Sequence, residues 1–263
     1  MVEGVFAIYK EEGMTSHDVV DAVRRSTGQQ RVGHAGTLDP CAKGVLVIGV
    51  GRAATRQLRL IAGTEKEYIT RVKLGWRSTT EDREGRIEQV FWPTEDGRGR
   101  PGSQTRSIAF GVPTPCLPCE GQPQGVAPTG MIPTEEQVRQ ALTHFQGTID
   151  QRPPVFSAIK VRGRAAYKLA RKGRQIDLPS RKVEVKEIEL LGYAWPYADV
   201  RLVTGPGFYV RSFARDLGEL LGTGGYLERL ERIRVGTYTK ERAIRLSDLA
   251  KSVRDVAGGD SLP

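Results

Sequence analysis

Residues 31–51 place a polar, glycine-rich segment directly before an apolar run, and this junction limits the folds open to the chain. The run from Val45 to Val50 is short, continuous and rich in β-branched residues, which predicts a buried strand. Pro40 fixes its own φ angle and keeps the preceding Asp39 out of the α-helical region, so Asp39 lies on extended or turn backbone. A loop anchored to a core strand in this way can hold a reactive carboxylate rigidly.

The composition is that of a globular protein long enough to bury a sizeable core: 263 residues, 38% of them hydrophobic and 27% charged. No apolar run approaches the ~18 residues of a membrane span. Residues 2–10 contain Glu3 and no continuous apolar core, so we expect no signal peptide and no membrane partner. Three cysteines at uneven spacing fit a reducing compartment, which predicts a cytoplasmic location.

The positive charge is concentrated in one segment. Residues 151–182 hold ten basic residues and one acid, Asp177, and carry the whole net charge of +9, which leaves 30 basic and 30 acidic residues elsewhere. A basic segment on a neutral body is typical of a surface that binds a polyanion. Taken alone, such a run is more often a solvated basic face.

Periodicity predicts an α+β fold with a mixed, mostly antiparallel sheet flanked by helices and loops. Strands are predicted over residues 4–9, 45–50, 67–75, 183–190 (with a bulge near Lys186), 200–203, 207–211 and 233–238. Helices are predicted from Thr15 or Ser16 to Gly28, from the capping box at Thr134 to Gly147, and over 212–221, with a short helix or turn over 55–60.

Residues 93–133 interrupt this pattern. They contain eight of the fifteen prolines and seven glycines, which predicts an extended loop insertion. Cys116 and Cys119 within it form half of a zinc site, and Cys41 is the only other cysteine. His17, His34 or His144 is the alternative source of a further ligand, but a lone pair of this kind constrains little, so we expect no metal.

Several familiar kinds of site are absent from the sequence. It has no phosphate-binding loop that ends in Gly-Lys-Ser/Thr, no dinucleotide fingerprint after the first strand and no His-x-x-x-His pair. Three histidines support a Ser-His-Asp hydrolase poorly. There remain Asp39, Arg211 at the end of a predicted strand, and tyrosines near strand starts. By residue type alone, Asp39 is more often a turn former than a nucleophile.

The segment Gly33-His-Ala-Gly-Thr-Leu-Asp-Pro40 resembles the catalytic motif of TruB-type tRNA pseudouridine synthases. Six further segments resemble family motifs in the family's order: Lys10-Glu-Glu-Gly-Met-Thr-Ser16, Glu67-Tyr-Ile69, Pro154-Val-Phe-Ser-Ala-Ile-Lys160, Gly207-Phe-Tyr-Val-Arg211, Asp216-Leu-Gly218 and Leu230 to Val235. The chain departs from the family pattern at Glu11, which replaces a proline, at Cys41-Ala-Lys43, which replaces Leu-Ala-Thr, and in the 93–133 insertion.

The resemblance implies a pseudouridine synthase fold. It also implies an enzyme that isomerises uridine to pseudouridine in the T arm of tRNA, at position 55, by base flipping and without a cofactor. Asp39 is then the catalytic carboxylate and Arg211 its counter-charge. Tyr68 stacks on the target uracil, and a part in the later C5 deprotonation is a second role open to it. Three residues complete the site: Tyr209 lines the pocket, Leu230 adds an apolar wall, and His34 enters the space that the flipped base leaves.

The basic segment is the RNA-gripping element under this resemblance. The residues expected to contact phosphates of the T stem-loop are Lys160, Arg162, Arg164, Lys168, Arg171, Lys172 and Arg174. We expect residues 1–250 to form one catalytic domain, followed by a tail over 251–263 without the PUA domain that many members carry, and we expect a monomer. Two rivals stay open: an RNA-binding protein without catalysis, and a glycosidase, which normally needs a second carboxylate.

Overall fold

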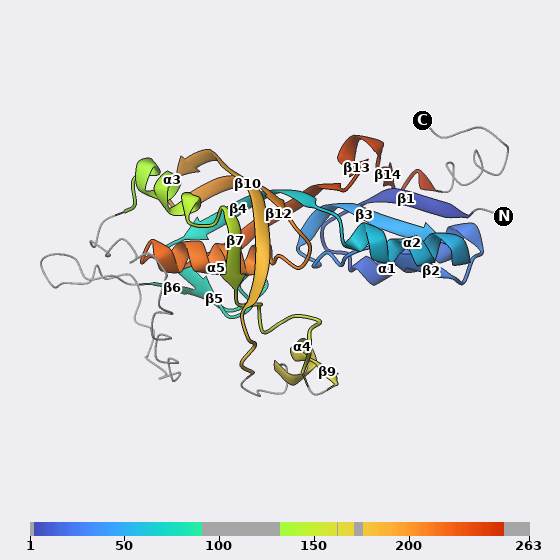
Figure 1. The fold of residues 1–263 in the computed structure, drawn as a ribbon, viewed down its shortest axis with the longest axis horizontal. Coiled ribbons are helices and arrows are strands. Elements are labelled where there is room, and N and C mark those ends of the chain that lie inside the picture. Colours follow the sequence, from blue (N-terminus) through green and yellow to red (C-terminus); the bar gives the residue numbers. More distant parts are fainter. Residues whose placement is uncertain (1–2, 91–131, 162, 171–175, 250–263) are drawn as a thin grey trace, which may run out of the picture.

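The computed structural model describes residues 3–90, 132–161, 163–170 and 176–249, and most of the described strands form one long sheet (Figure 1). The strand order is β14-β1-β3-β12-β4-β11-β10-β7, with β2 beside β3 and β13 beside β12. The strands of this sheet are β1 (Gly4–Lys10), β2 (Val32–His34), β3 (Ala42–Val50), β4 (Lys66–Leu74), β7 (Gly147–Gln151), β10 (Arg181–Ala194), β11 (Tyr197–Thr204), β12 (Gly225–Val235), β13 (Tyr238–Thr239) and β14 (Ile244–Arg245).

Two small hairpins and a set of helices surround this sheet. The hairpins pair β5 (Trp76–Ser78) with β6 (Ile87–Gln89) and β8 (Lys160–Val161) with β9 (Arg164–Ala165). The helices are α1 (Ser16–Thr27), α2 (Arg52–Ala62), α3 (Glu135–Thr143), α4 (Ala166–Ala170), α5 (Val210–Leu220) and the 3-10 turn η1 (Lys240–Arg242).

The sheet is mixed and mostly antiparallel, as predicted. β12 pairs in parallel with β3 at one edge and antiparallel with β4 at the other, so it joins the two halves of the sheet. Leu230 on β12 lies opposite both Ala42 on β3 and Thr70 on β4. This register brings the segment after Asp39 and the strand that carries Tyr68 to the same place.

The apolar run of β3 is buried on both faces, which explains why it does not alternate with polar residues. Val45 and Val47 pack in the cluster that includes α2, whereas Leu46 and Ile48 pack in the cluster with α1. Both helices lie at the end of the molecule where the described chain begins (Figure 1).

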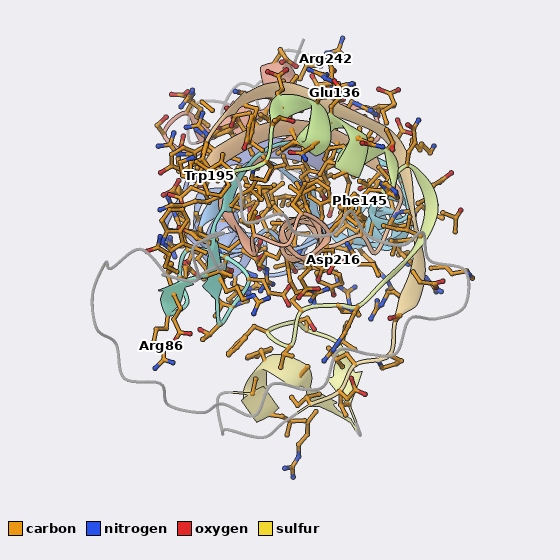
Figure 2. All side chains as sticks on the ribbon, turned by 90° about the vertical axis from the view of Figure 1, so that its left-hand side faces the viewer. Arg86, Glu136, Phe145, Trp195, Asp216 and Arg242 are labelled. Carbon is orange, nitrogen blue, oxygen red and sulfur yellow. The ribbon has the colours of Figure 1, made fainter. Side chains whose placement is uncertain are left out.

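α5 and α3 cover the other half of the sheet. Phe213 of α5 is fully buried and meets Phe145 edge-on, with ring centroids 5.0 Å apart. Figure 2 views the molecule from the end at which α3 and α5 lie. Phe145 is buried there, whereas Arg86 and Glu136 lie at the surface. No helix within the described ranges is long and apolar enough to cross a membrane.

The ends of two helices confirm local predictions. Thr15 caps α1 in a capping box with Asp18, and Thr134 caps α3 in a capping box with Gln137. α1 ends at the left-handed Gly28 as predicted, but α3 ends at Thr143, so the prediction that it runs to Gly147 was wrong. Gly147 instead begins β7, because its backbone pairs with β10.

Other boundaries also differ from their predictions. The strand predicted over 207–211 was wrong, since Gly207 lies in a turn and α5 begins at Val210. The Gln151 side chain holds that turn, donating to the Tyr209 carbonyl (3.0 Å) and accepting from the Tyr209 amide (2.8 Å). The bulge near Lys186 is confirmed by a register shift between Val185 and Glu187. Almost all of the 93–133 insertion, with Cys116 and Cys119, and the 251–263 tail lie outside the described residues.

Candidate active site

The Asp39 loop connects β2 to β3 and is fixed to the start of α1. The Ser16 hydroxyl donates to the Leu38 carbonyl (3.0 Å) and accepts from the Leu38 amide (2.9 Å). The fully buried Lys10 points its Nζ at the Pro40 carbonyl (3.5 Å), and burial lowers the pKa of this lysine. Bonds on both sides of Asp39 therefore immobilise the backbone that carries the carboxylate.

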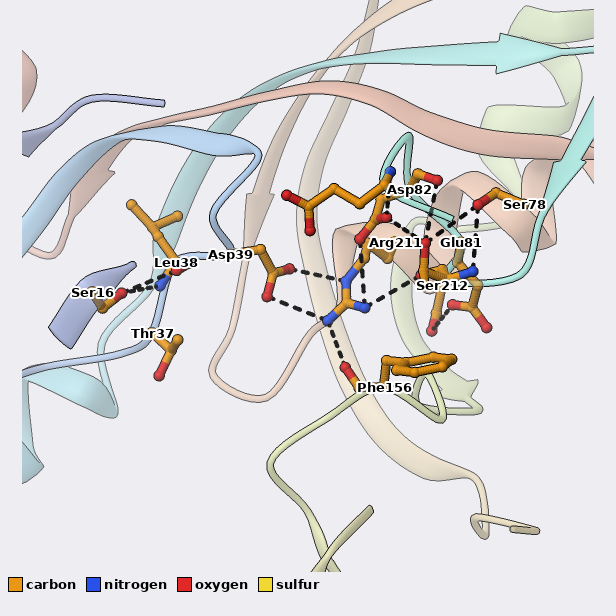
Figure 3. Close-up of polar contacts among 12 residues, drawn as sticks. Ser16, Thr37, Leu38, Asp39, Ser78, Glu81, Asp82, Phe156, Arg211 and Ser212 are labelled. Atoms are coloured by element: carbon orange, nitrogen blue, oxygen red, sulfur yellow. Dashed lines mark hydrogen bonds and ion pairs between the residues drawn. The ribbon is translucent and has the colours of Figure 1, made fainter. Parts of the chain in front are cut away.

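Arg211, in the first turn of α5, faces Asp39 (Figure 3). Its Nε lies 2.9 Å from Asp39 Oδ2, and its Nη2 lies 3.4 Å from Oδ1. Nη2 also donates to the Phe156 carbonyl (3.0 Å) and Nη1 to the Thr80 carbonyl (3.3 Å). The Arg211 side chain is 7% exposed and that of Asp39 34%, so the ion pair is closed on the arginine side and open at the carboxylate.

The turn at residues 79–85 supplies a second acid to this site, which the sequence interpretation missed. The Asp82 side chain is 4% exposed and its Oδ2 lies 3.7 Å from Arg211 Nη1. Thr80 Oγ1 and the Glu84 amide donate to Asp82 Oδ1, at 2.5 and 3.0 Å, so this carboxylate is well satisfied. A polar turn is common in any sequence, and the only available signal was its run of acids between two short strands.

Tyr68 and Leu230 form the apolar side of the site. Both are buried in one cluster with Leu38 and Ala42, the residues that flank Asp39. Burial raises the pKa of the Tyr68 phenol, so the ring is neutral at ordinary pH. The sequence interpretation named both residues, and the register of β12 against β3 and β4 brings them together.

Arg232 on β12 adjoins this cluster through Tyr68. No role was predicted for it from the sequence, although the Leu230 to Val235 segment was named as similar to a family motif. Arg232 is 1% exposed. Its guanidinium donates to the carbonyls of Val45 (2.8 Å), Gly36 (3.0 Å) and Thr37 (3.5 Å), and it hydrogen-bonds the Tyr68 phenol. Burial lowers the pKa of Arg232 while Tyr68 opposes that shift. Arg232 thus fastens the loop before Asp39 to β12.

Two protein-family models match the chain that forms this site. The family model described as the N terminal domain of TruB family pseudouridylate synthases matches residues 24–96 and 105–210, and the model for the tRNA pseudouridylate synthase B C-terminal domain matches residues 211–259. The chain belongs to the TruB family. The family predicted from the sequence motifs is confirmed, and the protein is an enzyme of pseudouridine synthesis.

Curated TruB relatives match almost the whole chain. The tRNA pseudouridine synthase B of Thermobifida fusca is 42% identical over 258 residues, which cover 95% of this chain and 75% of that protein. The tRNA pseudouridine synthase B of Mycobacterium leprae is 38% identical over 260 residues, which cover 95% of this chain and 69% of that protein.

Solved structures share the fold. A chain of a Cbf5-Nop10-Gar1 complex matches with a TM-score of 0.64 at 25% identity, over 98% of this chain and 57% of that one. A chain of the archaeal box H/ACA sRNP Nop10-Cbf5 complex matches with a TM-score of 0.60 at 21% identity, over 97% of this chain and 55% of that one. The present chain therefore spans just over half of these structural relatives, and the predicted α+β pseudouridine synthase fold is confirmed.

Two further predicted TruB site residues are carried by β2 and by the segment before α5. His34 is half-buried at the end of β2, and its Nδ1 is buried without a hydrogen-bond partner among the described residues. Burial and the nearby Arg232 lower the pKa of His34, so its ring is uncharged at neutral pH. Tyr209 precedes α5, and its ring centroid lies 5.8 Å from the Arg181 guanidinium. Within the described ranges the structure records no hydrogen bond or ion pair between either residue and Asp39.

The predicted RNA-gripping residues are only partly described. Lys160 and Arg164 are exposed on the β8–β9 hairpin. Arg162, Arg171, Lys172 and Arg174 lie outside the described residues, as does the side chain of Lys168. The hairpin and α4 extend below the rest of the molecule (Figure 1).

One group beside the TruB site has metal-ligand atoms in proximity. Ligand atoms of Cys41, Asp82 and Glu84 lie within 4.8 Å of one another. Burial raises the pKa of the Cys41 thiol to about 12, so the thiol is protonated, and Asp82 already faces Arg211. The Asp82 carboxylate already accepts hydrogen bonds from Thr80 and the Glu84 amide, and the Arg211 guanidinium beside it repels a cation, so these surroundings do not favour a metal.

Proposed function

We propose that this TruB protein isomerises a uridine in the T arm of tRNA, position 55, to pseudouridine, with Asp39 as the catalytic carboxylate. The observation that carries the proposal is the Asp39–Arg211 pair. Its cation is buried and held by Asp39, Asp82 and the carbonyls of Thr80 and Phe156, whereas the Asp39 carboxylate is partly exposed beside the apolar cluster that contains Tyr68 and Leu230. The curated relatives, named tRNA pseudouridine synthase B, support tRNA as the substrate.

The reaction breaks the bond between C1′ and N1 and forms one between C1′ and C5 of the same uracil. The C5 proton is lost and N1 regains a proton, so no redox or metal cofactor is consumed. The target base first leaves its stack, at a cost of about a few kcal/mol. Asp39 acts at the sugar or the base, as a nucleophile or as a base that removes a sugar proton. In each case it reacts ionised, and Arg211 provides the opposite charge.

Tyr68 holds the uracil on this proposal. A neutral ring next to the Leu230 side chain offers a flat apolar platform on which a detached base can turn without escaping. The raised pKa of Tyr68 favours this stacking role over one as acceptor of the C5 proton. His34, uncharged and half-buried, fills the space that the flipped base leaves, and Tyr209 lines the pocket on the α5 side.

The basic segment grips the T stem-loop. Residues 151–182 carry nine net positive charges, and the exposed Lys160 and Arg164 on their hairpin can reach phosphates. We assign residues 1–250 to one catalytic domain; of the predicted 93–133 insertion and 251–263 tail, the TruB family models match residues 93–96, 105–133 and 251–259, so these stretches have counterparts in the family. We further propose that the protein acts as a monomer in the cytoplasm, where tRNA is its substrate.

The test is release of tritium from tRNA that carries C5-labelled uridine. Asp39→Asn should abolish release, whereas the matched control Asp21→Asn, on the surface of α1 in an ion pair with Arg24, should not. Turnover by Asp39→Asn would remove Asp39 from the proposal. A transcript with cytidine at position 55 should give no release if that uridine is the target.

Two other outcomes identify the rival functions. A wild-type protein that binds tRNA but releases no tritium is an RNA-binding protein without this chemistry. Free uracil in place of pseudouridine marks a glycosidase. Binding should weaken steeply with salt if phosphates of the T stem-loop are gripped by the basic segment.

A further inference from the structure

A second ion pair lies directly behind the Asp39–Arg211 pair. Arg215, one helical turn after Arg211 on α5, places its Nη1 2.5 Å from Glu81 Oε1, and the side chains are only 21% and 14% exposed. The other Glu81 oxygen accepts from the Ser212 hydroxyl (3.2 Å). Figure 3 shows Glu81 and Ser212 on the side of Arg211 away from Asp39. Neither Glu81 nor Arg215 has a role in the mechanism above.

Glu81 is the central residue of the turn that serves Arg211. Its neighbours supply two of the partners of Arg211, the Thr80 carbonyl at 3.3 Å and Asp82 Oδ2 at 3.7 Å. Glu81 itself has a φ angle of +64°, in the left-handed region that residues other than glycine rarely adopt. Such a conformation persists only where surrounding contacts impose it.

Three contacts hold Glu81 in that conformation. The Glu81 carbonyl accepts from the Leu227 amide (2.9 Å), which ties the turn to β12. The Glu81 carboxylate binds Arg215 and Ser212, which ties the same residue to α5. The turn is thus fixed to β12 and to α5, the helix that carries Arg211.

Arg215 also holds the start of the basic segment. Its Nη2 donates to the Arg152 carbonyl (2.9 Å), while Arg211 donates to the Phe156 carbonyl (3.0 Å). Its Nε donates to Asp216 (2.8 Å), so all parts of the guanidinium are engaged. Arg211 and Arg215 of α5 therefore each bind both the 79–85 turn and residues 152–156, and so hold these two segments against the helix.

We infer that Glu81 and Arg215 form a positioning pair for the isomerisation. By fixing the Thr80–Asp82 turn, they set where the Arg211 guanidinium lies and so how the Asp39 carboxylate is aimed. Neither residue touches the reacting atoms. The inference rests on the proposed role of Asp39. Misplacement of a reactive group by about 1 Å can cost about 100-fold in rate. An ion pair that only positions the reactive groups can therefore still change kcat.

The kinetic test uses Glu81→Gln, Arg215→Met and the double variant, assayed by tritium release from C5-labelled tRNA. We expect kcat to fall about 10- to 100-fold in each single variant with KM changed less than about twofold. The double variant should fall no further than the worse single one, because the residues act as a unit. Arg215→Lys keeps the charge beside Glu81 and should recover part of kcat.

Controls separate positioning from folding. Glu135→Gln breaks an exposed ion pair with Arg139 on α3 and should leave kcat unchanged. Glu81→Gly accommodates the left-handed backbone without strain while removing the carboxylate, so its kcat should fall even though the turn can form. Wild-type kcat in both Glu81→Gln and Arg215→Met overturns the inference, as does strict additivity in the double variant.

A second measurement does not depend on activity. The Nε–H of Arg211, assigned in nitrogen-15 NMR spectra by its loss in Arg211→Lys, should exchange slowly with solvent in the wild type and faster in Glu81→Gln. Unchanged exchange overturns the inference. If the wild type makes no pseudouridine, the proposed function fails while this readout still decides the inference; if Asp39→Asn is inactive but both pair variants keep wild-type kcat, only the inference fails.

Discussion

Replacing Arg211 by lysine tests whether the fork of the guanidinium, and not only its charge, prepares Asp39. One guanidinium serves four acceptors: both oxygens of Asp39 and the carbonyls of Thr80 and Phe156, at 2.9–3.4 Å. An ammonium keeps the positive charge, but its three donors sit on one atom and cannot reach acceptors on opposite sides. At least one charge-assisted hydrogen bond is lost, which is worth about 1.5–3 kcal/mol.

That loss converts directly to a rate. Because about 1.4 kcal/mol is tenfold, kcat of Arg211→Lys should fall by about 10- to 150-fold when the bond matters fully in the transition state. Arg211→Met should be worse, since it leaves Asp39 and the buried Asp82 without the cation that both now face. The assay is single-turnover tritium release at saturating enzyme, so that tRNA affinity does not enter.

A conservative control isolates the geometry. Arg139→Lys, in an exposed ion pair with Glu135, makes the same chemical change at a site where it should have no measurable effect. The reasoning is refuted if Arg211→Lys keeps kcat within about twofold of the wild type, which is under 0.5 kcal/mol. If Arg211→Met is as active as Arg211→Lys, the lysine charge contributes nothing, which refutes the further loss expected from removing the cation.

Three further predictions concern stability. Gly44→Ala should prevent folding, since Gly44 has a φ of +116° and an added Cβ overlaps the Arg232 backbone, whereas Gly192→Ala, with open space around it, should be tolerated; soluble yield and melting temperature decide. Thr134→Ala removes the cap of α3 and should lower the free energy of unfolding by about 0.5–2 kcal/mol in urea melts without changing kcat. Burial raises the pKa of Asp216 from 3.8 to about 6, so the folded state binds the extra proton and the free energy of unfolding should fall as pH rises through that window. Asp216→Asn should reduce this dependence of the free energy of unfolding on pH; an unchanged dependence would show that Asp216 is not the group responsible.

Local signals predicted local structure well. The β-branched run at 45–50 is a strand, and the capping boxes at Thr15 and Thr134 begin helices, because these signals involve residues within a few positions of one another. The strand predicted over 207–211 was wrong for the complementary reason. Its backbone is held in a turn by Gln151, which lies 58 residues earlier in the chain, and no local pattern reports that contact.

The site shows the same division. Motifs in family order pointed to Asp39, Tyr68, Arg211 and Leu230, and the structure brings Arg211 to Asp39 and packs Tyr68 with Leu230. The Thr80–Asp82 turn and Arg232 were given no role. A short polar turn resembles any other in sequence, and a buried arginine that binds carbonyls has the same letter as an exposed one.

By itself the sequence determined the family, the core strand, the rigid loop that carries Asp39 and the segment that carries the positive charge. The family follows from the resemblance of seven segments, in family order along the chain, to TruB motifs, and the other three follow from residue type and short-range spacing. Only the tertiary structure decided which charges meet. Asp39 and Arg211 are 172 residues apart, and Glu81 and Arg215 are 134 apart. Sheet register and the packing of α5 bring each pair within hydrogen-bonding distance, and both depend on the whole chain at once.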